Sequence, residues 1–364
     1  MLDRRLAQNF DWPLLGITLV IILIGLLNLY SASASFRGAP TIFLKQCYWL
    51  LIGLSLMLII CMFDYRIFER LAYAIYIISV LLLILVLVMG EIRQGAQRWL
   101  EIGGFSLQPS ELVKLSLVLA LAKYFQDNWL PDGFRLRELI FPFLLMGIPA
   151  FLIILQPDLG SAVLLLFIAF SLLLFARIKL RSLANLAGSG LMVLPVFWFF
   201  LKDYQRRRLL SFLDPDRDPL GSGYHLIQSK IAVGSGEFLG KRFLQGTQTQ
   251  LHFLPEQHTD FVFSVWAEEW GFLGSVIVLS LYLFLILWGL SIASRSKDRF
   301  GAILAVGISA ILFCHVAVNI GMVVGFLPVV GVTLPLMSYG GSSLIITLIG
   351  VGLLLNISMR RYMF

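Results

Sequence analysis

Ten long apolar runs, separated by polar breaks, constrain this chain more than any other feature. A helix rises about 1.5 Å per residue, so roughly 20 apolar residues cross the hydrocarbon core of a bilayer. Only 13% of the residues are charged, whereas soluble domains carry about 25%. The pattern therefore predicts an all-α membrane protein of about ten transmembrane helices, centred near Leu23, Leu54, Leu82, Leu117, Leu145, Leu166, Val193, Val278, Ala310 and Ile346.

The positions of Lys and Arg predict how these helices are oriented. Cytoplasmic loops of membrane proteins carry an excess of basic residues. With the N-terminus in the cytoplasm, the inner segments hold 15 of the 28 basic residues and the short outer loops hold four. Both termini are thus expected in the cytoplasm. Residues 1–364 are predicted to form one polytopic domain, with a large extracytoplasmic loop at 202–264 between spans seven and eight.

Composition excludes several other classes of function. The net charge of +7 is mostly this orientation signal, lying against an anionic inner leaflet, so it does not indicate nucleic-acid binding. The three cysteines fall within apolar runs and the four histidines show no ligand spacing. We therefore expect neither a disulfide framework nor a metal site built from His and Cys.

Charged residues inside a span mark candidate functional positions, because each is costly to insert into a membrane. Glu111 and Lys114 lie three residues apart at the start of the fourth span, on one helix face. One interpretation is a self-compensating ion pair that holds the bundle together. The other is a polar cavity in which Lys114 presents positive charge to an anionic substrate and Glu111 orients it.

Three further polar positions lie at predicted outer boundaries. Asp158 follows a tight turn before the sixth span and is either a helix cap or a site residue. Arg98 precedes Trp99 and is either part of an interfacial anchor or a phosphate contact. Asp260 is the last acid before the eighth span. Capping by Thr259 or Asp260 is one interpretation, and a functional carboxylate at the level of lipid headgroups is the other.

Five segments in order along the chain resemble one family, the shape, elongation, division and sporulation (SEDS) proteins. The resemblance runs from the third span to the tenth, and the short predicted tails favour the cell-elongation branch over the division branch. The matching segments are GAQRWLEIGGFSLQPSELVKL, ILQPDLGSA, SFLDPDRDPLGSGYHLIQSKIAVGSGEFLGK, GTQTQLHFLPEQHTDFVFSVWAEEWG and GVTLPLMSYGGSS.

The resemblance implies a function and a set of site residues. SEDS proteins polymerise lipid II into glycan strands on the outer face of the bacterial cytoplasmic (inner) membrane, together with a class B penicillin-binding protein that crosslinks the product. By its motifs the essential loop aspartate is Asp260, and the expected substrate-binding residues are Glu111, Lys114, Asp158, Arg98 and Lys241. The family usually has glycine after Lys241, where this chain has Arg242.

The chemistry of glycan polymerisation fits these residue types. Converting an α-linked diphosphate into a β-1,4 bond inverts the anomeric carbon in one displacement, which needs a base for the acceptor hydroxyl and positive charge at the leaving diphosphate. Asp260 is the expected base, and partial burial would raise its pKa from about 3.9. Arg98, Lys114 and Lys241 supply positive charge. Arg206, Arg207 and Arg208 contact either lipid headgroups or the substrate.

Three questions stay open at this stage. A divalent cation, Mg or Mn, is compatible with the chemistry because hard cations prefer oxygen ligands, but no cofactor is required by the pattern. A flippase that moves lipid II across the bilayer is the alternative function, since a polar cavity suits either task. A structural scaffold of the elongation machinery is a third. The outer positions of Arg98, Asp158, Lys241 and Asp260 favour the polymerase.

Overall fold

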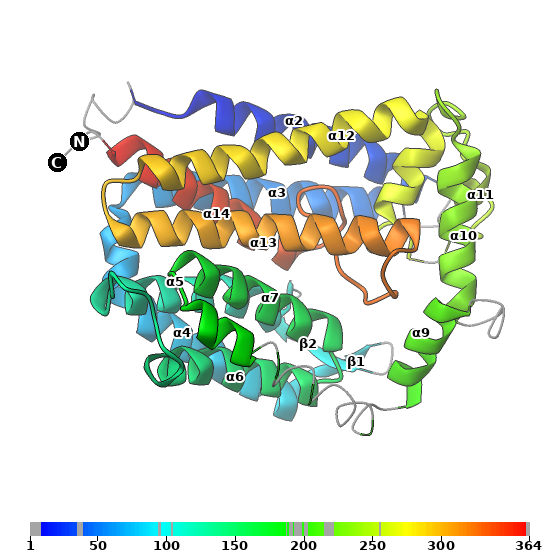
Figure 1. Ribbon diagram of the computed structural model, residues 1–364. Helices are drawn as coiled ribbons and strands as arrows, with labels where there is room; N and C mark the ends of the chain where they lie inside the picture. Colours follow the sequence, from blue (N-terminus) through cyan, green and yellow to red (C-terminus); the bar gives the residue numbers. More distant parts are fainter. Residues whose placement is uncertain are drawn as a thin grey trace.

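The computed structural model describes residues 9–34, 39–93, 96–102, 105–186, 203–214, 222–254 and 256–361, with single positions 188, 192 and 199. Helices account for nearly all of the regular structure (Figure 1). They are α2 (Trp12–Ser33), α3 (Ala39–Met62), α4 (Tyr65–Met89), α5 (Pro109–Asp127), the 3-10 turn η1 (Leu136–Leu139), α6 (Ile140–Leu155), α7 (Leu159–Phe175), α9 (Asp203–Leu213), α10 (Ser222–Ser235), α11 (Thr247–Gln250), α12 (Val262–Arg295), α13 (Arg299–Val324) and α14 (Gly341–Arg360).

Seven described stretches are long and apolar enough to cross a membrane. They belong to α2, α3, α4, η1 with α6, α12, α13 and α14, and α7 is a shorter apolar helix. The prediction of a helical multi-pass membrane protein is confirmed. The number of ten spans stays a prediction, and the span expected near Val193 lies outside the described residues.

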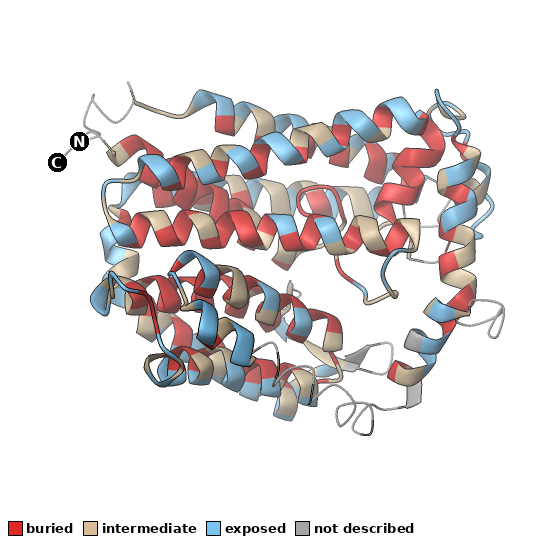
Figure 2. Ribbon diagram, viewed as in Figure 1, coloured by how far each residue is buried: buried red, intermediate tan, exposed pale blue. Residues whose placement is uncertain are grey.

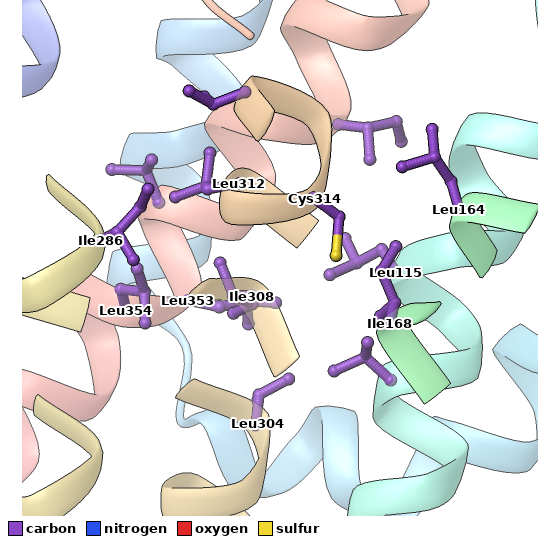
Figure 3. Packing of buried hydrophobic residues seen from close by; sticks show 14 of the residues in the cluster. Leu115, Leu164, Ile168, Ile286, Leu304, Ile308, Leu312, Cys314, Leu353 and Leu354 are labelled. Carbon is purple, nitrogen blue, oxygen red and sulfur yellow. The ribbon is translucent and has the colours of Figure 1, made fainter. Parts of the chain in front are cut away.

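Helix α13 forms the centre of the bundle. It packs against α5, α7, α10, α12 and α14, and Leu304, Ile308 and Leu312 meet side chains of the neighbouring helices (Figure 3). A Cβ at Gly307 would overlap the Val118 side chain, so a small residue permits the close approach of α13 and α5. Buried residues dominate α13 and α14, whereas α4 and α6 carry many exposed apolar residues (Figure 2).

The first and last described helices meet at one end of the bundle (Figure 1). The carboxylate of Asp11 accepts a hydrogen bond from Ser358 at 2.8 Å and another from the Trp288 indole nitrogen at 2.9 Å. The start of α2, the last part of α12 and the end of α14 are therefore tied together by one side chain.

A small antiparallel sheet lies near the opposite end. Its strands β1 (Glu91–Arg93), β2 (Ala96–Ile102) and β3 (Phe105–Leu107) pair in the order β1-β2-β3. Helices α9 and α10 cross this end of the bundle at a steep angle to the long helices (Figure 1). The segment around Arg98 was predicted to be an outer loop, so the sheet is a correction.

Helix α12 is kinked at Gly271, where φ is 63° and ψ is −159°. The main chain of residues 236–245 lies along the kink. The amides of Lys241 and Arg242 donate to the carbonyls of Glu268 and Glu269, both at 3.0 Å. The kink therefore exposes helix carbonyls to which the amides of the neighbouring turn segment donate hydrogen bonds. The sequence predicted only a span centred near Val278, without the kink or this contact.

Two glycines make this approach sterically feasible. A Cβ at Gly271 would overlap the backbone nitrogen of Gly240, and a Cβ at Gly240 would overlap the carbonyl of Glu269. Both glycines have positive φ, which L side chains rarely adopt. Arg242, at the position where SEDS proteins usually have glycine, also has a positive φ of 80°. Arg242 therefore replaces the usual glycine at a position where the backbone is in the left-handed conformation.

We expect Gly271→Ala to destabilise the protein by about 2 kcal/mol or more, because the added Cβ meets main chain and the backbone angle is unfavourable. Gly147→Ala in α6 is the matched control, since no described atom lies within 4 Å of a Cβ there and alanine favours a helix interior. Thermal unfolding in detergent, followed by size-exclusion chromatography, measures both. Equal melting temperatures for the two variants would contradict this account.

Candidate functional site

Asp260 lies in the turn that leads into α12 and is partly exposed. The N-cap residue of α12 is Phe261, and no side chain caps the helix there. The Thr259 hydroxyl instead donates to the Glu256 carbonyl at 3.3 Å. The capping interpretation of Thr259 and Asp260 is therefore wrong, which leaves the carboxylate of Asp260 without a role in starting the helix.

The main chain around Asp260 is held by α13 and by the loop between α13 and α14, residues 325–340. Asn319 of α13 donates to the Asp260 carbonyl at 2.8 Å. The Ser338 hydroxyl donates to the Thr259 carbonyl at 2.6 Å, and the Tyr339 amide donates to the His258 carbonyl at 2.8 Å. These three bonds fix the turn against α13 and the α13–α14 loop.

The carboxylate of Asp260 faces the same loop. Gly331 lies beside it, and a Cβ there would stand 3.3 Å from Oδ2. Burial raises the pKa of Asp260 from 3.8 to about 6, and the negative charge of Glu256 acts in the same direction. Arg208, Arg98 and the Thr259 hydroxyl partly oppose that rise in the pKa. The environment therefore turns an ordinary carboxylate into a stronger base.

Arg98 and Asp158 form a pair near Asp260. The Arg98 guanidinium on β2 donates to the Pro157 carbonyl at 2.6 Å, and its Nη1 lies 3.7 Å from Oδ1 of Asp158. Asp158 also accepts from the Ser161 amide at 3.2 Å and so caps α7. Capping explains only part of its contacts, because the same oxygen meets a cation. Arg98 is therefore fixed by the turn that precedes α7.

Arg208 brings a second guanidinium to this region. From α9, its Nη1 lies 3.5 Å from the Val329 carbonyl of the α13–α14 loop. Arg98 and Arg208 are both close enough to Asp260 to lower its pKa. One carboxylate and two cations, carried by β2, α9 and the turn before α12, therefore share one region.

Glu111 and Lys114 are paired inside the bundle. Lys114 Nζ lies 2.7 Å from Oε1 of Glu111 and 2.6 Å from Nε2 of His315 on α13. The three residues line a cavity of about 20 Å³, whose other walls include Ile308 and Ile346, with room for about one water molecule. Asp158 is not among the lining residues, and His315 was missed because a lone histidine in an apolar run has no motif.

Lys241 lies against the kink of α12. Its Nζ donates to Oε1 of Glu268 at 3.0 Å and to the Thr247 hydroxyl at 2.8 Å. Glu268 is fully buried and also accepts from Gln248 and Thr249. The described contacts therefore pair the partly exposed Lys241 with a buried carboxylate, and its role as a substrate contact stays a prediction.

The parts of the chain that the structure describes contain no group of three or more His, Cys, Asp or Glu residues arranged to hold a metal ion. The negative charge of Glu256 acts on Asp260 and raises the pKa of its carboxyl group.

The chain belongs to the family described as "Cell cycle protein", which groups FtsW, RodA and SpoVE proteins; residues 12–363 match it. The predicted SEDS membership is thereby confirmed. The chain is 42% identical over 356 residues to the peptidoglycan glycosyltransferase MrdB of Escherichia coli K12, covering 98% of this chain and 95% of that protein. It is 36% identical over 366 residues to a probable peptidoglycan glycosyltransferase FtsW of Geobacter sp. strain M18, covering 98% of each.

Solved structures share the fold along the whole chain. One, described as "structural coordination of polymerization and crosslinking by a peptidoglycan synthase complex", has a TM-score of 0.84 and 40% identity, covering 98% of this chain and 99% of that one. Thermus thermophilus RodA has a TM-score of 0.72 and 34% identity, covering 97% of this chain and 98% of that one.

We expect Lys241→Met to lower stability by about 1–3 kcal/mol, because it leaves the buried Glu268 carboxylate without its cation. Adding Glu268→Gln should recover part of this loss, since an amide needs no counter-charge. Lys45→Met, at an exposed position on α3, is the control. Thermal unfolding measures all three. An unchanged melting temperature with a raised KM for the lipid substrate would instead indicate that Lys241 contacts substrate.

Proposed function

We propose that this chain polymerises lipid II into β-1,4 glycan strands on the outer face of the bacterial cytoplasmic membrane during cell elongation, with Asp260 as the catalytic base. The enzyme class, a peptidoglycan glycosyltransferase, follows from the family and from full-length relatives that carry that name. The observation that carries the proposal is the Asp260 carboxylate, whose pKa is raised to about 6 beside two arginines.

The proposed reaction is a single displacement. Asp260 takes the proton from the 4-hydroxyl of the acceptor sugar as its oxygen attacks the anomeric carbon of the donor. The new C–O bond forms while the bond from that carbon to the diphosphate breaks, so the α linkage becomes β. The proton remains on Asp260 until solvent removes it. A pKa of about 6 leaves the base ionised at neutral pH.

Positive charge at the leaving diphosphate comes, in this proposal, from Arg98 and Arg208. A guanidinium presents paired N–H donors that match phosphate oxygens. Asp158 acts through Arg98, because it fixes the position of that side chain. Glu111, Lys114 and Lys241 were predicted to bind substrate directly. Their described contacts are with protein partners, and their contacts with substrate stay predictions.

The proposed membrane topology has ten spans in one polytopic domain, residues 1–364, with both termini in the cytoplasm and residues 202–264 outside. The meeting of Asp11 and Ser358 supports placing both chain ends on one side. The sheet, α9 and α10 lie toward the other end (Figure 1), which is where the proposal puts lipid headgroups and substrate.

The proposed protein partner is a class B penicillin-binding protein that crosslinks the new strands. Its support is the similarity to a chain of a peptidoglycan synthase complex in which polymerization and crosslinking are coordinated. Membrane lipids surround the exposed apolar faces of the outer helices. We include no metal ion in the reaction, and a divalent cation at the diphosphate remains an addition that the chemistry permits.

The flippase alternative finds less support in the described structure. A flippase needs a polar passage for the whole headgroup, whereas the cavity beside Glu111 and Lys114 has room for about one water molecule. No observation here favours the scaffold interpretation over the enzyme.

We expect Asp260→Asn to reduce glycan polymerisation by a factor on the order of 10²–10⁴, because the amide has almost the same shape but cannot accept the proton. The assay uses purified protein with its partner and lipid II in detergent, where no bilayer exists to be crossed. Glycan made by the wild type under these conditions also excludes a function limited to flipping.

Asp64→Asn, which changes a capping aspartate of α4, is the control and should retain activity. Wild-type rates in Asp260→Asn would remove Asp260 from the catalytic role.

We expect kcat to be half-maximal near pH 6 and to fall about tenfold per pH unit below that, because the ionised form of Asp260 is the base. A carboxylate with an ordinary pKa of 3.8 would keep kcat flat from pH 5 to 8.

The raised pKa also affects stability. The protonated form of Asp260 fits the folded state better, so its stabilising effect is present below pH 3.8 and is lost as pH rises through about 6. Asp260→Asn should therefore melt at a higher temperature than the wild type at pH 8, and this difference should shrink toward pH 4. A flat kcat together with equal melting temperatures would contradict the raised pKa.

A further inference from the structure

We propose that His315 and Asn319 are positioning residues for Asp260. They lie one helical turn apart on the same face of α13. Together they connect the buried Glu111–Lys114 pair to the main chain that surrounds the carboxylate. The inference rests on the proposed role of Asp260 as the base.

Asn319 holds two segments at once. The residue is fully buried, and its amide nitrogen donates to the Asp260 carbonyl at 2.8 Å and to the Val332 carbonyl at 2.7 Å. An asparagine amide has two N–H groups, so both are used. The turn before α12 and the α13–α14 loop are therefore held in register by one side chain of the central helix.

His315 holds the next carbonyl of the same loop. Its Nε2 lies 2.6 Å from Lys114 Nζ, and its Nδ1 lies 3.3 Å from the Thr333 carbonyl. A lysine ammonium only donates hydrogen bonds, so Nε2 must accept, and the ring proton is then on Nδ1. Lys114 thus sets the tautomer of His315 that can donate to Thr333.

The two contacts fall on consecutive residues of the loop, Val332 and Thr333. The residue before them, Gly331, is the one that faces the Asp260 carboxylate. A displacement of this segment would change both the main chain and the surroundings of the carboxylate. A misplacement of about 1 Å at a reacting group can lower the rate about 100-fold. This is why a pair of buried side chains without any substrate contact bears on the reaction.

The arrangement also gives the buried ion pair a function. Glu111 engages Lys114 from the same helix, α5, at 2.7 Å. The contact to His315 then carries this orientation to α13. Through its contact with His315, Lys114 therefore helps to fix the position of the α13–α14 loop.

The test compares Asn319→Leu with Asn356→Leu. Asn356 on α14 is equally buried and also donates to two carbonyls, those of Ile60 and Phe63, at the opposite end of the bundle. Both variants should lower the melting temperature. We expect Asn319→Leu to lower kcat at least tenfold, per folded protein, with KM for lipid II within twofold of wild type. Asn356→Leu should leave both kinetic constants unchanged.

Two variants of His315 distinguish the effect of its hydrogen bond to Thr333 from the effect of the space that its side chain fills. His315→Leu should lower kcat, and His315→Asn should recover part of it, because an amide nitrogen near the place of Nδ1 can still donate to Thr333. Equal kcat for these two variants, or unchanged kcat in Asn319→Leu, would overturn the inference. If Asn319→Leu does not fold, Asn319→Thr, which keeps one donor, is measured by the same criteria.

Hydrogen exchange of residues 329–334 gives a readout that does not depend on the identity of the base. Exchange should accelerate in Asn319→Leu and not in Asn356→Leu. Faster exchange with unchanged kcat would reject the positioning role alone. Activity retained in Asp260→Asn, with faster exchange in Asn319→Leu, would instead reject the proposed function and leave the loop contacts as a structural feature.

Discussion

In hydrocarbon, a polar group without a partner costs several kcal/mol, and the interior of this bundle depends on meeting that constraint. The central helix α13 carries His315 and Asn319 among apolar neighbours, and the side-chain nitrogens of both residues are hydrogen-bonded within the protein. Because the partners of these nitrogens are loop carbonyls, the turn carbonyl of Asp260 and a buried lysine, the same bonds also fix loops against helices. The same bonds that make the core stable therefore locate the turn that carries Asp260.

The end of the bundle near Asp260 combines rigid and charged parts. The Ser338 hydroxyl and the Tyr339 amide donate to carbonyls of the turn and hold it, while Arg98 and Arg208 approach from separate elements. Burial raises the pKa of the carboxylate, and the two cations limit the rise. In the proposed reaction this site supplies a base and positive charge, which suits a displacement whose leaving group is already good.

Sequence reasoning predicted the helical membrane fold because apolar runs of about 20 residues have few alternatives. It could not predict the kink at Gly271 or the short sheet at 91–107, since both depend on contacts between distant segments. The motifs indicated Asp260, Asp158 and Arg98 as individual residues. They did not reveal that Lys241 pairs with Glu268. Nor did they indicate that His315 and Asn319 contact the α13–α14 loop, because a single polar residue in an apolar helix forms no recognisable pattern until its partners are known.

The central claim is that Asp260 is held at the outer water–lipid boundary. Labelling of Asp260→Cys tests it most directly, in a chain whose Cys47, Cys61 and Cys314 are replaced by alanine. The account predicts that a membrane-impermeant maleimide added to intact spheroplasts labels residue 260, while Asp298→Cys at the other end of the bundle reacts only after permeabilisation. Labelling of residue 260 only from the cytosolic side, or from neither side, would contradict the account.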